Sequence, residues 1–233
     1  MTVSPVPDTE AIAWSALVVS GPDAESFLSG QLTQDVTDLD RPRWSLVLQP
    51  DSTVVAPVWV TRRGDDLALV LERALAETTL ARLKRFRLRV ACSLEVVESV
   101  EGPYATVGER VGARWPGAPE AASGLTPHGL GRRVLEATVS FTKGCYTGQE
   151  LVGRLDARGA RVPWRLVVAR ASSVEAIEEV LASRGPEGPR GVTTAVVRDG
   201  AVHALAVAHR TVVAGPHGEV VIDEVDEVGT LPE

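Results

Sequence analysis

The chain has 233 residues, of which 44% are hydrophobic, and it carries a formal net charge of −7. This length and apolar content are enough to bury a substantial core, as one large domain or two small ones. The acidic balance argues against a general electrostatic grip on DNA or RNA, which needs a basic face.

The first hundred residues predict alternating strands and helices. Residues 11–20 are apolar and predict a buried strand, and 21–28 predict a short helix with one apolar face. A strand pair is expected at 44–49 and 54–61, a third strand at 67–71 and a helix at 73–85. Residues 86–99 alternate like a long strand, with Leu88, Val90, Cys92 and Leu94 on one face, so Cys92 is expected in the core.

The remainder predicts a loop and then a second, mostly β domain. Residues 102–133 are rich in glycine, proline and alanine and indicate a loop or reduced subdomain, in which His128 is expected to be solvated. Short strands are expected at 161–170, 192–199, 201–213 and 218–223, interrupted by a helix at 173–184 and a flexible linker at 184–189. The acidic end, 223–233, is expected to be solvated. The predicted division is therefore 1–160 and 161–233.

The sequence lacks patterns typical of a signal peptide, a membrane span or a metal site. Residues 1–10 lack a basic region followed by an apolar core, so no signal peptide is predicted, and no stretch approaches the roughly 20 apolar residues of a membrane span. A cytoplasmic protein with reduced thiols and no membrane contact is expected. The two cysteines, Cys92 and Cys145, are too far apart in sequence to form a ligand cluster, so spacing predicts no metal site.

One octapeptide concentrates the rare residues of the chain: Lys143-Gly144-Cys145-Tyr146-Thr147-Gly148-Gln149-Glu150. Lys143 is one of only two lysines among 24 basic residues, and it lies two positions from a cysteine. In an extended segment both side chains share a face, and a nearby ammonium favours the reactive thiolate. An inert glycine turn with a half-buried cysteine is the alternative interpretation. The clustering favours a reactive site, with Lys143 and Cys145 as the candidate catalytic residues.

A helix is expected to begin at Gly148–Glu150 and to run to about Asp156. Thr147 is the expected N-cap, with Glu150 at N3 in a capping box. The positive end of that helix would then lie beside Cys145 and favour an anion. Arg154 is expected either to pair with Glu150 or to face a ligand.

Two stretches resemble a known family. The octapeptide, continued by Val152, Arg154, Arg158 and Gly159, is similar to the signature of the YgfZ family, which are folate-binding-like proteins related to the T-protein (aminomethyltransferase) of the glycine cleavage system. A second stretch, from Gly21 to Val36, resembles the N-terminal segment of that superfamily. The resemblance implies an α+β fold: a folate-binding, aminomethyltransferase-like domain, here shortened, followed by a small C-terminal β-barrel.

The resemblance also implies function. The implied cofactor is tetrahydrofolate or a derivative, with Tyr146, Gln149, Glu150 and Arg154 as ligand-binding residues. The implied role is iron–sulfur cluster synthesis or repair through Cys145, with iron–sulfur proteins or their assembly factors as partners. A tetrahydrofolate-dependent one-carbon transferase and a non-catalytic binding module are the alternatives.

Two departures from the transferase pattern bear on activity. The segment Ser52–Pro57 takes the place of the loop that carries the catalytic aspartate of the transferases, and Ala56 stands where that aspartate is expected. Cys145 likewise replaces an aspartate of their signature. The shortened stretch 100–133 lacks an obvious equivalent of the acidic residue that binds the pterin ring. The sequence therefore does not predict amine-transfer chemistry and leaves enzymatic activity open.

Overall fold

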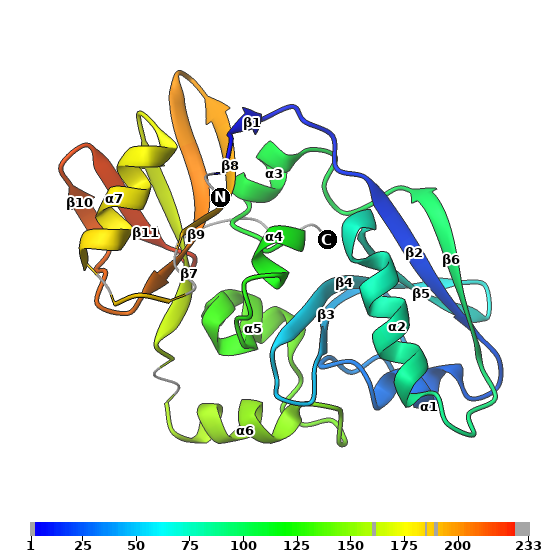
Figure 1. Ribbon diagram of the computed structural model, residues 1–233. Helices are drawn as coiled ribbons and strands as arrows, with labels where there is room; N and C mark the ends of the chain where they lie inside the picture. The colour runs from blue at the N-terminus through cyan, green and yellow to red at the C-terminus, as the bar shows by residue number, and fades with distance from the viewer. Residues whose placement is uncertain (1–2, 160–161, 185, 189–190, 227–233) are drawn as a thin grey trace.

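The computed structural model describes residues 3–159, 162–184, 186–188 and 191–226. Within these ranges the strands form two sheets, with α3, α4 and α5 between them (Figure 1). The first sheet has the order β3-β4-β5-β2-β6, and every neighbouring pair is antiparallel. Its strands are β2 (Trp14–Ser20), β3 (Arg43–Leu48), β4 (Val54–Arg63), β5 (Asp66–Glu72) and β6 (Ser93–Val100).

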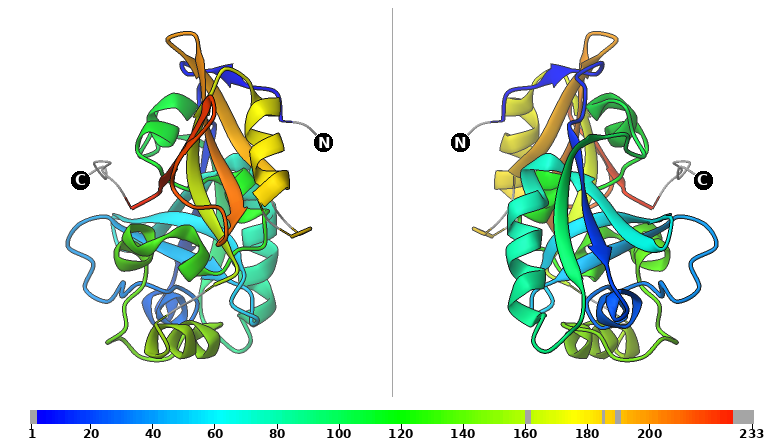
Figure 2. Two further views of the ribbon diagram at one scale, coloured as in Figure 1. Left: turned by 90° about the vertical axis from the view of Figure 1, so that its left-hand side faces the viewer. Right: turned by 90° about the vertical axis from the view of Figure 1, so that its right-hand side faces the viewer.

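Helices cover the first sheet because its strands other than β6 are largely buried on both faces. In β2 every residue from Trp14 to Val19 is buried, as is typical of a strand with no solvated face. The 3-10 turn η1 (Arg73–Leu75) leads into α2 (Ala76–Phe86), which packs along β2, β4 and β6. The right-hand view of Figure 2 shows α2 alongside β2 and β6. The short α1 (Ala24–Ser29) buries Phe27 and Leu28.

The predicted long strand at 86–99 is only half correct. β6 begins at Ser93, and the residues before it form a connection in which Leu88 is 78% exposed. Cys92 is half-buried and packs against the core from this connection rather than from a strand face. Alternation of apolar residues indicated a strand here, but the connection bends at Leu88 and Arg89, and Arg89 has a φ of 58°.

The segment 102–133, which was predicted to be a loop or a reduced subdomain, contains short helices. It contains α3 (Val107–Gly112), α4 (Ala118–Ala121) and η2 (Pro127–Leu130), and α5 (Arg132–Thr138) follows directly. Thr106 and Glu109 form a reciprocal capping box at the start of α3. Trp115, between α3 and α4, is fully buried. The segment supplies the core that joins the two sheets.

The second sheet has the order β1-β8-β9-β7-β11-β10. Its strands are β1 (Val6–Pro7), β7 (Trp164–Ala171), β8 (Gly191–Arg198), β9 (Ala201–His209), β10 (Gly215–His217) and β11 (Val220–Glu224). The helix α7 (Val174–Arg184) buries Val174, Ile177 and Leu181 against β7, β8 and β9. The predicted closed barrel is not confirmed, because β1 and β10 are opposite edges with no pairing between them among the described strands.

The two predicted domains share structure. The N-terminal β1 pairs in parallel with β8, so a segment from the start of the chain belongs to the second sheet. Leu166, Leu205 and Val207 of the second sheet also belong to the core cluster of the first. The predicted boundary at residue 160 lies outside the described residues, as do parts of the predicted linker and most of the predicted acidic end. The division into 1–160 and 161–233 stays a prediction.

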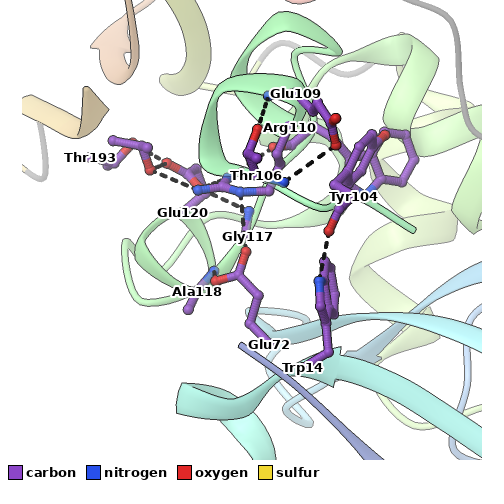
Figure 3. A network of polar contacts seen from close by, with 12 residues as sticks. Trp14, Glu72, Tyr104, Thr106, Glu109, Arg110, Gly117, Ala118, Glu120 and Thr193 are labelled. Atoms are coloured by element: carbon purple, nitrogen blue, oxygen red, sulfur yellow. Dashed lines mark hydrogen bonds and ion pairs between the residues drawn. The ribbon is translucent and has the colours of Figure 1, made fainter. Parts of the chain in front are cut away.

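A buried ionic network links the sheets through the helical segment (Figure 3). The Arg110 guanidinium lies 2.8 Å from Glu120 Oε2 and 3.1 Å from Glu72 Oε1 at the end of β5. The other Glu120 oxygen accepts hydrogen bonds of 2.6 Å from the hydroxyls of Thr193 and Thr194 on β8. Arg110 therefore connects the first sheet to the second through side chains that are almost completely buried.

Candidate functional site

The octapeptide contacts residues 29–34, which are part of the second stretch that resembles the family. More than a hundred positions separate the two in the sequence. The Ser140 amide donates to the Thr33 carbonyl at 3.0 Å, and the Thr147 amide donates to the Gly30 carbonyl at 3.0 Å. These two bonds hold the motif loop at both ends. The two stretches that resemble the same family are therefore one structural unit.

Lys143 strengthens this contact from within the loop. Its ammonium donates to the carbonyls of Ser29 at 2.7 Å, Leu32 at 2.9 Å and Gln34 at 3.1 Å. Burial lowers the pKa of Lys143 to about 8, and the Asp35 carboxylate opposes that shift. A lysine has three donors and no acceptor, so this environment satisfies its protonated form.

Cys145 lies between these anchors and is exposed. It is a free thiol, as is the half-buried Cys92. Burial raises the pKa of the Cys92 thiol, with Asp23 adding to this and Arg87 opposing it. The accessible thiol of the pair is therefore the one in the motif.

The helix after the motif is α6 (Gln149–Ala157), close to its predicted bounds, but the predicted Thr147 cap is wrong. Gly148 precedes the helix in a left-handed conformation, with φ of 85°, and no side chain caps the helix. The Thr147 hydroxyl instead donates to Gly30 and Gln31. Glu150, the other half of the predicted box, pairs with Arg154 one turn along.

Gly148 is required by its surroundings. A Cβ at this position would lie 2.7 Å from the Gln49 carbonyl oxygen. The Ser52 hydroxyl donates to the Gly148 carbonyl at 2.5 Å. The turn before β4 therefore packs directly on the motif, while Ala56 is fully buried within β4.

A cleft of about 320 Å³ opens beside the motif. Burial raises the pKa of the Tyr146 hydroxyl to about 12, so the phenol stays protonated. The Lys143 nitrogen lies 5.5 Å from the centre of the Tyr146 ring, and the Gln149 side chain accepts from the Tyr146 amide at 2.9 Å. The described lining residues are Ser140, Phe141, Lys143, Tyr146, Gln149, Glu150 and Gly153.

The structure thus brings together four of the six predicted site residues in one cleft. Arg154 lies on the same helix and pairs with Glu150. Cys145 is next to the cleft in sequence but is not among the described residues that line it.

Sequence reasoning missed the support beneath the motif. Arg82, on the buried face of α2, donates to the Leu48 carbonyl at 2.8 Å and to Gln31 Oε1 at 3.0 Å. The same Gln31 oxygen accepts from the Thr147 hydroxyl at 3.3 Å. Burial lowers the pKa of Arg82 to about 10. Its position on the apolar face of a predicted helix is the signal that could have identified it.

His128 is a further correction, because it is buried rather than solvated. It is 8% exposed, and neither ring nitrogen has a hydrogen-bond partner among the described residues. It forms part of the wall of a second cavity of about 730 Å³ between η2, α5, α6 and the second sheet. Burial lowers the pKa of His128, with Asp156 opposing the shift, so the ring is neutral at pH 7.

Within the described ranges the structure has neither a metal-ligand cluster nor a membrane-spanning helix. No three side chains of the metal-ligating types His, Cys, Asp or Glu come together as a cluster that could hold an ion. No helix there is both long enough and apolar enough to cross a membrane.

The fold of the chain has a known structural counterpart. It is similar to the glycine cleavage system aminomethyltransferase T of Bartonella henselae, with a TM-score of 0.55 over 97% of this chain and 87% of that one, at 15% sequence identity. The chain thus has an aminomethyltransferase-like α+β fold.

The chain is also similar in sequence to proteins named YgfZ. The chain is 25% identical to the tRNA-modifying protein YgfZ of Cronobacter sakazakii, over 63% of this chain and 66% of that protein. It is also 25% identical to the YgfZ of Klebsiella pneumoniae, over 79% of each chain. No protein-family model matches. The chain spans slightly less than two thirds of the Cronobacter protein, and the resemblance to the YgfZ family is confirmed.

Proposed function

We propose that the protein binds a reduced folate in the motif cleft and assists iron–sulfur cluster synthesis or repair through Cys145. The observation that carries the proposal is the convergence of Lys143, Tyr146, Gln149 and Glu150 on one cleft beside an exposed thiol. Its support is the aminomethyltransferase-like fold together with similarity to YgfZ proteins.

Several features favour this role over amine transfer. Ala56 offers no acid–base group and is fully buried. The motif presents a thiol, which can carry sulfur or ligate iron only as a thiolate. A net charge of −7 does not favour a direct grip on tRNA, so a small molecule and a protein partner fit better than a nucleic acid. A cytoplasmic location remains part of the proposal.

Thermal unfolding with a panel of reduced folates tests the binding half. A ligand at 100 times its Kd stabilises the native state by about 2.7 kcal/mol, which for a chain of this size is a Tm increase of about 5–10 °C. Glu150→Gln should reduce the shift, because Glu150 lines the cleft. Glu175→Gln is the matched control, since Glu175 is also an exposed acid in the first turn of a helix.

The thiol half needs a separate readout. Cys145→Ser should keep the folate-dependent Tm shift but fail to restore iron–sulfur enzyme activity in cells that depend on this protein, whereas Cys92→Ser should restore it. If no reduced folate raises the Tm, the folate assignment is wrong. If Cys145→Ser restores activity fully, the protein is a binding module with an inert cysteine.

A further inference from the structure

We propose that Lys143 is a positioning residue, whose ammonium latches the Cys145 loop onto a cradle of three backbone carbonyls. The cradle consists of the Ser29, Leu32 and Gln34 oxygens, 2.7–3.1 Å from the Lys143 nitrogen. This assigns Lys143 a role different from that of a base or nucleophile. The proposal deepens the proposed function, since it concerns how the same site presents its thiol.

The hydrogen-bond count supports the latch. An ammonium has three N–H donors, and three carbonyls accept from this one. A base or nucleophile must direct a lone pair at its substrate. Loss of the proton would leave one of the half-buried carbonyls without a donor, and an unsatisfied polar group is costly. The cradle therefore opposes the deprotonated form, although burial by itself favours it.

The position of Lys143 in the loop supports the same conclusion. Lys143 holds one end of the segment 143–147, and the hydrogen bond from the Thr147 amide to Gly30 holds the other. Between them, Gly144 has open space where a Cβ would lie, so packing does not confine the loop at that point. On the N-terminal side of Cys145 the latch acts together with two bonds of Ser140, whose amide donates to the Thr33 carbonyl at 3.0 Å and whose hydroxyl accepts from the Lys143 amide at 3.2 Å. The latch is the side-chain contact nearest to Cys145 among these three.

The cradle also explains why this cation is a lysine in a chain rich in arginine. Its three oxygens converge on a single nitrogen, which suits the compact lysine ammonium. The five donors of a guanidinium are spread over a rigid planar fork and suit bidentate acceptors instead. Lys143→Arg should therefore not restore the latch, even though it retains the positive charge.

Reductive methylation of the wild-type protein tests the state of the amine directly. The only other lysine, Lys84, is exposed and serves as an internal reference in the same molecule. The lowered pKa of Lys143, about 8, would by itself make this amine the faster of the two at pH 7.5. The cradle predicts the opposite: because its donors are engaged, Lys143 should react at least about tenfold more slowly than Lys84. In urea the two rates should become equal. A Lys143 that reacts as fast as Lys84 or faster in the native protein would overturn the latch.

Variants then test positioning in a Cys92→Ser background. In Lys143→Ala, amide exchange across residues 144–147 should rise by at least about tenfold, since the charged hydrogen bonds to the cradle are lost. The alkylation rate of Cys145 should change with it. Propylammonium replaces the missing atoms and should restore both values, whereas Lys143→Arg should not.

The control is Gly144→Ala, which has room for its methyl group and should leave the exchange unchanged. If Lys143→Ala alters the alkylation rate while loop exchange stays as in the wild type, Lys143 acts by charge and the latch is wrong. If Lys143→Arg behaves as the wild type, the cradle does not select lysine and the proposal also fails. None of these readouts uses folate or an iron–sulfur protein, so their failure is distinct from failure of the proposed function.

Discussion

Replacement of Arg110 by methionine should destabilise the protein severely. The Arg110 side chain is 3% exposed, and the two carboxylates that it bridges, Glu72 and Glu120, are 14% and 0% exposed. Methionine fills similar space but leaves the Glu120 charge without its cation. Removing one partner of a buried ion pair costs about 3–5 kcal/mol, so we expect a loss of that size in the free energy of unfolding.

Urea unfolding followed by tryptophan fluorescence measures this loss, because Trp115 lies in the core beside the network and its carbonyl accepts from Arg110. Adding Glu120→Gln to Arg110→Met should recover part of the stability, since it removes the uncompensated charge. The control is Arg132→Met, which breaks an exposed ion pair with Glu136 and should cost no more than about 1 kcal/mol. An Arg110→Met protein within about 1 kcal/mol of the wild type would refute the reasoning.

The same network makes a pH prediction. Burial alone would raise the pKa of Glu120, but Arg110 and the hydroxyls of Thr193 and Thr194 outweigh it and hold the pKa below its usual value. Its stabilising contribution is therefore present above the unfolded pKa and is lost as pH falls through the lower folded value. Unfolding of Glu120→Gln below about pH 4.5 should show a weaker acid dependence than that of the wild type.

Three further results are expected. Burial depresses the pKa of His128, so stability should fall as pH drops below the unfolded pKa of about 6.5. In denaturation measured between pH 7.5 and 5.5, His128→Asn should lose that pH dependence. A variant with the pH profile of the wild type would contradict this prediction. Gly148→Ala should lower the free energy of unfolding by about 1–3 kcal/mol, because Gly148 has a positive φ and lies close to the Gln49 carbonyl. Gly153→Ala, where a Cβ has open space, should instead stabilise α6 by about 0.5–1 kcal/mol. Changes of the same sign in the two variants would contradict this prediction. Iodoacetamide at pH 7 should modify the exposed Cys145 before Cys92, as followed by peptide mapping, and equal rates would reject the assignment.

Elements with a strong local signal were predictable from the sequence. The apolar run in β2 and the periodic face of α2 both carry their pattern in consecutive residues. The segment 102–133 escaped because α3 has six residues and α4 and η2 have four each, too short for a helical period to show. The tryptophan at 115 was the available clue, since tryptophan is highly buried on average and so argues against a solvated segment.

The site shows the same limit. The motif is visible in the sequence because rare residues cluster in it. The helix α6 was predicted from a capping box of Thr147 and Glu150, and its bounds are close to the predicted ones although that box does not form. The Thr147 cap was wrong because capping rules weigh only neighbours, whereas this hydroxyl bonds Gln31, which is 116 positions away. The cradle around Lys143 is made of backbone carbonyls, which every residue type possesses, so it leaves no trace in the sequence.

The pairing of β1 with β8 has a consequence for synthesis of the chain. Asp8, just after β1, bonds Arg198 at the end of β8 across 190 positions. At about 5–20 residues per second, the ribosome makes β1 roughly 10–40 s before its partner strand exists. β1 is thus made well before it can be placed, and until it docks, β8 is an open edge that another chain can join. Capture of β1 therefore covers Val196 and Val197 of this edge, and it can occur only after β8 has been made.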